Sequence, residues 1–339
     1  MASDPVLDVR GLEVSFRTPA GRQAAVRGVS FEIGSGEIVA LVGESGSGKS
    51  TTGLAIMGLL EGEGGASVAG EIVLTGKSGT PRDLSRLPER ALRAIRGSDV
   101  AMIFQEPLSS LNPIYTIGAQ ICEAIRIHRS VPRKEARRDA LEALTQLGIP
   151  NPSACMENYP HQLSGGMRQR VMIAMALACG PALLIADEPT TALDVTIQAQ
   201  IIDHLRRLQS RTGMSILFIT HNLGLVAEIA DRALVMYAGQ IVEAGPVDAV
   251  FRSPRMPYTR ALLGSLPRIG RTRRSGAKLS AIPGNVPGLM AVPGGCSFHP
   301  RCADAVGGRC DVSVPPLEAC GRDHGVRCLR WREIGGEPQ

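Results

Sequence analysis

The segment Gly43-Glu-Ser-Gly-Ser-Gly-Lys-Ser50 holds the residue types and spacing that point most directly to chemistry. It fits the pattern G-x-x-x-x-G-K-[ST] at every fixed position, and loops of this pattern cradle phosphate groups. Glycines let backbone N–H groups converge on phosphate oxygens with no Cβ atom in the way. We expect Lys49 to reach the β- and γ-phosphates and the Ser50 hydroxyl to ligate Mg²⁺. The predicted nucleotide contacts from this segment are Gly43, Ser45, Gly46, Ser47, Gly48, Lys49, Ser50 and Thr51.

Polar side chains follow two other apolar runs of the sequence. The run Leu183-Leu-Ile-Ala ends in Asp187 and Glu188, and His221 comes directly after the run Ile216–Thr220. A carboxylate at the carboxyl end of a strand, beside a phosphate loop, can hold the Mg²⁺ shell, which suits Asp187. Glu188 is then free to polarise an attacking water as a general base. Taken alone, such a run is more often a strand that enters a turn, and a lone histidine is more often structural, so these assignments depend on the phosphate loop.

Apolar patterns predict the elements that must position these residues. Glu37–Val42 precedes the phosphate loop as a buried strand and Thr51–Leu60 follows it as a helix, a context that disfavours a chance match by a Gly/Ser-rich turn. Strands that alternate with helices indicate an α/β fold with a mainly parallel central sheet. The other predicted elements are antiparallel strands at Leu7–Phe16 and Ala25–Ile33 around a turn at Pro19–Arg22, helices at Glu89–Ile95, Lys134–Leu147 and Thr196–Thr212, and strands at Leu183–Ala186 and Ile216–Thr220.

Composition limits the possible classes of function. The 339 residues are 44% apolar, which is enough for a core and too much for a disordered chain. The first residues show no secretory signal. The longest uncharged apolar stretch, Val171–Ala186, has 16 residues, fewer than the roughly 20 that a spanning helix needs. We therefore expect a soluble chain, or one that meets a membrane only through a partner.

The charge is unevenly distributed along the chain. Residues 252–339 carry 14 Lys or Arg and 6 Asp or Glu, which leaves the rest of the chain slightly acidic. The body is therefore not a basic nucleic-acid binder, and we expect no nucleic-acid partner.

Leu163-Ser-Gly-Gly-Met-Arg-Gln169 resembles the signature motif of ABC-type ATPases, and other motifs follow that family's order over about residues 6–260. Gln105 resembles the Q-loop glutamine, and Thr191-Ala-Leu-Asp194 resembles the D-loop. His221 resembles the switch histidine, and Phe16 resembles the aromatic residue that stacks on adenine. The resemblance implies an ATPase that binds ATP and Mg²⁺. The implied catalytic residues are Glu188, His221 and Gln105, and the implied Mg²⁺ shell is Ser50, Gln105 and Asp187.

The signature residues Ser164, Gly165 and Gly166 open a helix, and they form a second nest of hydroxyl and amide groups for phosphate. In the resembled family this nest meets the nucleotide bound by the opposite subunit, so the chain is expected to act as half of a head-to-tail pair. The resemblance also implies a P-loop NTPase (RecA-like) ABC ATPase core with an antiparallel β subdomain. That domain spans residues 1–260, with a helical signature subdomain at about 107–180, and a small Cys-rich C-terminal extension spans 261–339.

Several segments resemble the dipeptide/oligopeptide importers, in particular their first, D-type, ATPase subunit. The resemblance implies a heterodimer with a second related ATPase, two transmembrane permeases and an extracytoplasmic solute-binding protein. It also implies a peripheral position on the cytoplasmic face of the inner membrane. Leu108 and Leu111, within Glu106–Asn112, are expected to contact a permease. The segments that carry the resemblance are Phe104–Pro113, His221–Asp231, Met236–Glu243, Pro257-Tyr-Thr259, Ile282-Pro-Gly284 and Gly295–Cys302.

Five of the eight cysteines lie in the last 44 residues, with the spacing Cys296-x5-Cys302-x7-Cys310-x9-Cys320-x7-Cys328. Without a secretion signal, clustered cysteines suggest metal before disulfides, although no C-x2-C pair is present for a zinc ribbon. Some members of the resembled subfamily hold a [4Fe–4S] cluster here, which implies Cys296, Cys302, Cys310 and Cys328 as ligands and leaves Cys320 without a counterpart. Zinc, or cysteines without metal, are the alternatives. Three arginines beside these thiols are expected to offset a cluster's negative charge: Arg301, Arg309 and Arg327.

Two other functions remain open at this point. One is an importer of the same type for another solute, such as nickel, an opine or an oligosaccharide, because the solute never touches the ATPase. The other is a soluble ABC ATPase that acts on ribosomes or DNA. Such proteins usually carry two cassettes or long coiled coils, whereas this chain has one phosphate loop and no sustained heptads.

Overall fold

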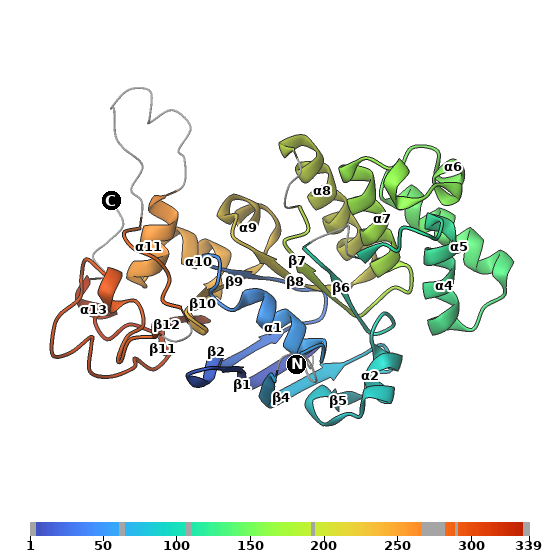
Figure 1. Cartoon of the computed structure of the whole chain (residues 1–339). Coiled ribbons are helices and arrows are strands. Elements are labelled where there is room, and N and C mark those ends of the chain that lie inside the picture. Colours follow the sequence, from blue (N-terminus) through green and yellow to red (C-terminus); the bar gives the residue numbers. More distant parts are fainter. Residues whose placement is uncertain are drawn as a thin grey trace, which may run out of the picture.

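The computed structural model describes residues 5–60, 65–105, 110–190, 194–265, 282–288 and 291–334. Two β-sheets form its centre, with helix α1 (Lys49–Ile56) packed between them (Figure 1). Three helices cover the other face of the larger sheet: α7 (Gly165–Leu177), α8 (Val195–Thr212) and α9 (Leu223–Ile229). This is the predicted α/β arrangement.

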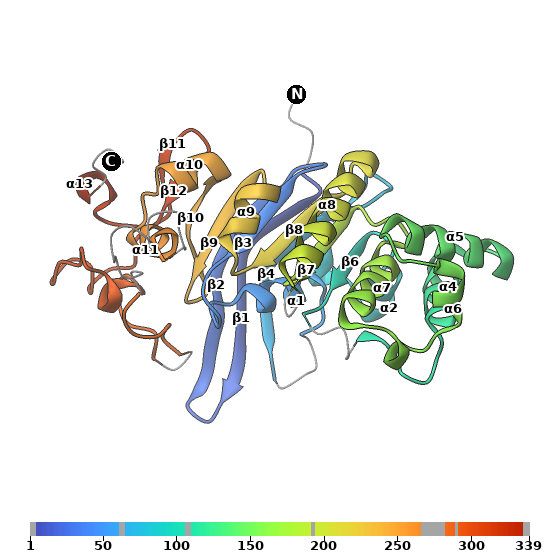
Figure 2. The same cartoon turned by 90° about the horizontal axis from the view of Figure 1, so that it is seen from above.

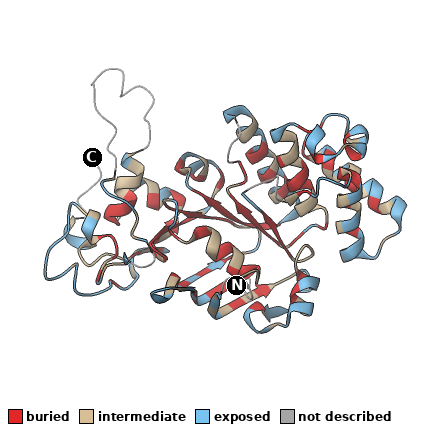
Figure 3. Ribbon diagram, in the orientation of Figure 1, coloured by how far each residue is buried: buried red, intermediate tan, exposed pale blue. Residues whose placement is uncertain are grey.

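The larger sheet has eight strands in the order β11-β12-β10-β9-β3-β8-β7-β6. Its parallel part consists of β9 (Arg232–Tyr237), β3 (Ile38–Val42), β8 (Ser215–Thr220), β7 (Leu183–Asp187) and β6 (Val100–Ile103). Every residue of β3, β7 and β8 is buried, as expected for parallel strands that are covered on both faces (Figure 3). The three predicted core strands are therefore confirmed. Their carboxyl ends meet at one edge, where ligands of such sheets bind.

The smaller sheet is antiparallel, in the order β2-β1-β4-β5. The predicted hairpin is present, but its strands are longer than the apolar alternation indicated, so that the turn contains only Pro19 and Ala20. The strands are β1 (Leu7–Thr18), β2 (Gly21–Ile33), β4 (Ser67–Thr75) and β5 (Pro81–Asp83).

A group of helices lies beside β6, at the opposite end of the molecule from the C-terminal extension (Figure 2). It consists of α4 (Ile117–Arg129), α5 (Arg133–Gln146), α6 (Pro152–Glu157) and α7, all within residues 107–180, and the division of the chain into subdomains stays a prediction. The helix predicted at Lys134–Leu147 is α5, which buries Ala136, Ala140 and Leu144. Helix α2 (Glu89–Ile95) and α8 also lie where the sequence predicts helices.

Helix α1 differs from its prediction at both ends. It begins at Lys49 rather than Thr51, because the chain turns into the helix directly from the phosphate loop. It ends at Ile56 rather than Leu60. Gly58 adopts the left-handed conformation with φ of 63° just beyond, which stops the helix.

The C-terminal extension shares the central sheet with the rest of the chain. Its strand β12 (His324–Val326) pairs antiparallel with β10 (Gln240–Pro246), and β11 (Glu318–Gly321) pairs with β12. The predicted domain boundary near residue 260 falls inside α11. The other helices among the described residues are α10 (Val247–Arg252), α11 (Pro257–Gly264), α13 (Trp331–Ile334) and short 3-10 turns at Leu84–Arg86, Pro160–Gln162 and His299–Arg301. Within the described ranges, no helix has both the length and the apolar character that crossing a bilayer requires.

Candidate active site

A cavity of about 330 Å³ opens at the start of α1, and predicted nucleotide contacts form most of its wall. We call it the nucleotide cavity. Of the residues predicted from the phosphate loop and the Mg²⁺ shell, Gly43, Ser47 and Asp187 do not line it, and neither does His221. The residues that line it are Phe16, Ala25, Ser45, Gly46, Gly48, Lys49, Ser50, Thr51, Gln105 and Glu188.

Two glycines of the phosphate loop sit where a side chain cannot fit. A Cβ atom on Gly43 would lie 2.1 Å from the carbonyl oxygen of Met236, and one on Gly48 would lie 2.7 Å from that of Ala25. Gly48 also has φ of 104°, a conformation that favours glycine. The loop therefore packs against the backbone of Met236 and Ala25 more closely than a side chain would allow. Ser47 is fully buried, and its Oγ finds no hydrogen-bond partner among the described residues.

The Lys49 ammonium is buried at the base of the loop. Its Nζ atom donates to the carbonyl oxygens of Gly43 and Glu44, at 2.9 Å each. Burial lowers the pKa of Lys49, while the nearby carboxylates of Glu188, Asp187 and Glu44 act in the opposite direction. A bound polyphosphate would add negative charge beside this ammonium and favour its protonated form.

Ser50 and Asp187, two predicted Mg²⁺ ligands, are in contact. The Ser50 hydroxyl donates to Asp187 Oδ1 at 3.1 Å. Burial raises the pKa of Asp187, with the Ser50 hydrogen bond acting in the opposite direction. A hydroxyl and a buried carboxylate are hard oxygen donors of the kind that Mg²⁺ prefers, and the cation's charge would offset the cost of burying the carboxylate. The donor set therefore fits Mg²⁺.

The three predicted catalytic residues meet at Glu188. Glu188 Oε2 accepts from Gln105 Nε2 at 3.3 Å, and Glu188 Oε1 lies 2.9 Å from His221 Nδ1. The Glu188 backbone is left-handed, with φ of 46°, and its N–H donates to Ile219 O at 2.9 Å. That bond to β8 holds an otherwise strained conformation in which the carboxylate faces the cavity.

The signature residues do not join the nucleotide cavity of this chain. Ser164, Gly165 and Gly166 line a separate, open pocket of about 860 Å³, the signature pocket. Ser164 Oγ accepts from Met167 N at 3.3 Å and so caps α7. Asp194 lines the same pocket, whereas the rest of the predicted D-loop, residues 191–193, lies outside the described residues.

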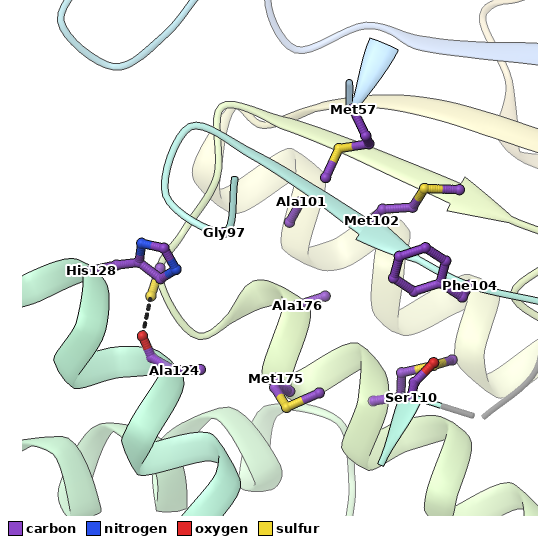
Figure 4. A pocket seen from close by; sticks show the side chains of 12 residues that line it. Met57, Gly97, Ala101, Met102, Phe104, Ser110, Ala124, His128, Met175 and Ala176 are labelled. Carbon is purple, nitrogen blue, oxygen red and sulfur yellow. Dashed lines mark hydrogen bonds between the residues drawn. The ribbon is translucent and has the colours of Figure 1, made fainter. Parts of the chain in front are cut away.

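An apolar pocket of about 300 Å³ lies between β6 and the helical group, and we call it the apolar pocket. Met102 and Phe104 reach it from β6 and the residues after it, and Met175 and Ala176 reach it from α7 (Figure 4). Of the two leucines expected to contact a permease, Leu108 lies outside the described residues. Leu111 is only 3% exposed and packs in the core, so that part of the prediction is wrong.

Four of the five tail cysteines line one small pocket, and Cys320 does not line it. These four are the predicted cluster ligands Cys296, Cys302, Cys310 and Cys328, and we call their site the thiol pocket. Burial raises the pKa of three of its thiols, that of Cys302 to about 11. Among the described residues, however, no group of three or more His, Cys, Asp and Glu side chains is placed to hold a metal ion. The iron–sulfur cluster stays a prediction.

The arginines beside these thiols have other partners. Arg301 forms an ion pair with Glu44 at 2.8 Å, and Arg309 forms one with Glu333 at 2.6 Å. Arg327 donates to backbone carbonyl oxygens. Arg301 and Arg309 are thus each paired with a carboxylate, and the expectation that they offset a cluster's charge stays a prediction.

The sequence did not predict the residues outside the phosphate loop that bind Glu44, namely Tyr258 and Arg301. Glu44 occupies a variable position of the motif, yet its N–H donates to Tyr258 Oη at 2.9 Å and its carboxylate pairs with Arg301. Arg301 lies 257 positions away from Glu44. No local pattern could have predicted a contact over that separation.

Known proteins resemble this chain over nearly its whole length. The family model for the ABC transporter matches residues 26–191, and that for the oligopeptide/dipeptide transporter C-terminal region matches residues 242–310. A relative from Brucella melitensis, named as a peptide import ATP-binding protein, is 57% identical over 98% of this chain and 99% of its own. The dipeptide transport ATP-binding protein DppD of Escherichia coli is 47% identical over 98% of this chain and 99% of its own.

Solved structures share the fold of the ATPase part. The dimeric ATP-binding cassette MJ0796 bound to ADP and Pi has a TM-score of 0.63 and 26% identity, covering 71% of this chain and 98% of its own. The protein cbiO1 of Clostridium perfringens, part of an ABC transporter complex, has a TM-score of 0.60 and 29% identity, covering 73% of this chain and 91% of its own. The predicted P-loop ABC ATPase fold is confirmed. The chain belongs to the ABC transporter ATPases, in the branch whose members are named as peptide import ATP-binding proteins.

Proposed function

We propose that this chain is the ATP-hydrolysing subunit that powers import of di- and oligopeptides across the cytoplasmic membrane. The observation that carries the proposal is that Gln105 and His221 both contact the carboxylate of Glu188, which lines the nucleotide cavity together with Gln105. The names of the relatives support the peptide substrate. Import of nickel, an opine or an oligosaccharide remains the alternative, since the solute would not touch this chain.

The chain's own residues divide the work of hydrolysis. Lys49 and the loop amides would bind the phosphates, and Ser50 and Asp187 would hold Mg²⁺, which would supply positive charge to offset that of the phosphates. Glu188 takes the proton of the water that attacks the γ-phosphorus, and ADP leaves. Gln105 and His221, which both contact the Glu188 carboxylate, orient that carboxylate and the water. Phe16 lines the cavity where the adenine ring would stack.

A second ATPase subunit completes the site in this proposal. Ser164, Gly165 and Gly166 would bind the γ-phosphate held by the partner, and the partner's signature would do the same here. The support is the position of these residues in a pocket of their own, apart from the nucleotide cavity of this chain. We propose a heterodimer with a related ATPase, bound to two permeases and fed by an extracytoplasmic binding protein.

The apolar pocket is the proposed docking place for a permease segment. Phe104 is 37% exposed there and directly precedes Gln105, which contacts Glu188. An apolar permease helix seated on Phe104 would therefore lie one residue from the hydrolytic cluster. Such docking would hold the chain on the cytoplasmic face of the inner membrane.

The thiol pocket is the proposed site of a [4Fe–4S] cluster. Cys296, Cys302, Cys310 and Cys328 line this pocket together, which supports the proposal, and zinc remains the alternative. The cluster would tie together the loops of the extension, which carry little regular structure.

Reconstitution tests the proposed function. The complex would be purified from membranes through a tag on this chain and placed in lipid vesicles, and ATP hydrolysis would be measured with the solute-binding protein and candidate solutes. We expect di- and oligopeptides to stimulate hydrolysis, and Lys49→Ala to abolish it. Stimulation by nickel or an oligosaccharide instead of peptides would show that the imported solute is not a peptide. Recovery of the chain with ribosomes and not with membranes would overturn the transport function.

A further inference from the structure

The C-terminal extension reaches the phosphate loop through one arginine. Arg301 Nη1 lies 2.8 Å from Glu44 Oε2, and Arg301 Nη2 lies 3.0 Å from Glu44 Oε1. This is the two-pronged geometry in which arginine binds a carboxylate most strongly. The Arg301 side chain is only 6% exposed and that of Glu44 is 29% exposed, so solvent screens the pair less than it would a surface ion pair.

Arg301 is itself held in place by the extension and the sheet. Its Nε donates to Pro283 O at 2.8 Å, and its Nη2 donates to Gly284 O at 3.2 Å. The guanidinium carbon lies 5.8 Å from the centre of the Tyr237 ring and 6.0 Å from that of the Phe298 ring. The guanidinium is therefore a fixed anchor rather than a mobile surface charge.

Every polar group of Glu44 is occupied. Its N–H donates to Tyr258 Oη and its carbonyl oxygen accepts from Lys49 Nζ, both at 2.9 Å. Its carboxylate is bound by Arg301. Glu44 thus joins the extension on one side to the lysine that meets the phosphates on the other. A rotation of this residue would move the carbonyl oxygen that holds Lys49.

Charge adds a second consequence. The Glu44 carboxylate belongs to the same residue whose carbonyl oxygen holds the Lys49 ammonium at 2.9 Å. Without Arg301, the carboxylate would be unpaired, would compete for that ammonium and would oppose an incoming polyphosphate. Loss of Arg301 would therefore weaken ATP binding in two ways, through the position of the Glu44 carbonyl oxygen and through the charge of the Glu44 carboxylate.

We propose that Arg301 is a positioning residue of the nucleotide site, which acts through Glu44 to set the phosphate loop for ATP. The proposal rests on the proposed ATPase function. It means that ATP affinity depends on the C-terminal extension, although the extension contributes no residue to the wall of the nucleotide cavity.

Equilibrium binding of MgATP to the full-length chain tests the proposal. We expect Arg301→Met to raise the dissociation constant by about 5- to 20-fold, and Arg301→Lys, which keeps charge but not the two-pronged contact, by about 2- to 5-fold. In a Glu44→Gln background, Arg301→Met should change the constant by less than about twofold, because its partner is already gone. Arg309→Met is the matched control, since Arg309 pairs with Glu333 within the extension, and it should bind MgATP as the unaltered chain does.

Steady-state hydrolysis separates positioning from damage to the fold. A positioning role predicts that Arg301→Lys raises KM by the same factor as the dissociation constant and changes kcat by less than about twofold. Equal affinity in Arg301→Lys and the unaltered chain would overturn the proposal. So would an Arg301→Met effect that is just as large in the Glu44→Gln background, because Arg301 would then serve only to hold the extension. If the unaltered chain did not bind MgATP, or bound it equally after Lys49→Ala, the proposed function itself would fail.

Discussion

The Nδ1 atom of His221 lies 2.9 Å from Oε1 of Glu188, although 33 positions separate the two residues. Glu188 directly follows β7 and His221 directly follows β8, and the carboxyl ends of these two neighbouring parallel strands share one edge of the sheet. Gln105 reaches the same carboxylate from the end of β6, the next strand along. Three adjacent strands therefore bring the three predicted catalytic residues together, and Gln105 and Glu188 line the nucleotide cavity.

The first prediction concerns the general base. Glu188→Gln keeps the size of the side chain but removes the proton acceptor, so ATP turnover should fall by about 10²–10⁴-fold. MgATP binding should persist, because the phosphate loop is unchanged. Single-turnover hydrolysis and equilibrium binding on the same preparation measure the two effects. Glu142→Gln, on an exposed face of α5, is a control that should leave both unchanged. Hydrolysis at the unaltered rate would show that Glu188 is not the base.

The second prediction concerns the buried carboxylate of Asp187. Because burial raises the pKa of Asp187, its charged form costs stability at neutral pH. Asp187→Asn should therefore raise the free energy of unfolding at pH 7 by about 0.5–2 kcal/mol, while hydrolysis falls by at least about 10²-fold through loss of a Mg²⁺ ligand.

The pH dependence of that effect has a definite sign. As pH falls through the raised pKa of Asp187, the carboxyl gains its proton in the folded chain before it would in the unfolded chain. The stability difference between the two proteins should therefore shrink as the solution is acidified. Denaturant unfolding at several pH values measures it. Asp203→Asn, an exposed control, should change stability by less than about 0.5 kcal/mol. An Asp187→Asn chain that is less stable at pH 7 would contradict the prediction.

The third prediction concerns docking on the permeases. Phe104→Asp places a charge in the apolar pocket, so co-purification with the permeases and peptide uptake should fall by about tenfold or more. MgATP binding by the isolated chain should change little. Val312→Asp is the control, because Val312 is 71% exposed in the extension, away from that pocket. Normal uptake in the Phe104→Asp complex would exclude the pocket as the docking place.

The fourth prediction concerns the thiol pocket. A four-thiolate cluster needs all its ligands, so chain purified without oxygen should be brown and contain iron and acid-labile sulfide. Cys296→Ser, Cys302→Ser, Cys310→Ser and Cys328→Ser should each lose most of that colour. Cys320→Ser should keep it, because Cys320 does not line the pocket.

The same measurement distinguishes the alternatives. Colourless anaerobic protein with stoichiometric zinc would show that the pocket is a zinc site. Protein with neither metal would show that these cysteines bind no metal. Loss of colour in Cys320→Ser but not in Cys328→Ser would show that a cluster is present and that its fourth ligand is Cys320 rather than Cys328. MgATP should still bind after each of these substitutions, because neither the wall of the nucleotide cavity nor the contact of Arg301 with Glu44 uses a cysteine side chain.

The sequence alone was sufficient for the chemistry that is encoded in short, continuous segments. The phosphate loop could be predicted because its amides, Lys49 and Ser50 act from neighbouring positions. The strands before Asp187, Glu188 and His221 could be predicted because strands covered on both faces are apolar throughout. The rule that parallel strands share one carboxyl edge then indicated that these residues meet.

Tertiary structure decided what depends on contacts between distant segments. The apolar type of Leu111 suits a core and a docking surface equally well, and only packing against the helical group shows that it is buried. The short strand β12 has no strong alternation of its own, and its pairing with β10 joins the extension to the central sheet. Arg301 stands beside a cysteine in the sequence, yet its partner is Glu44, 257 positions earlier. Ion pairs of this kind are set by where the folded backbone places two side chains, and residue types along the chain do not carry that information.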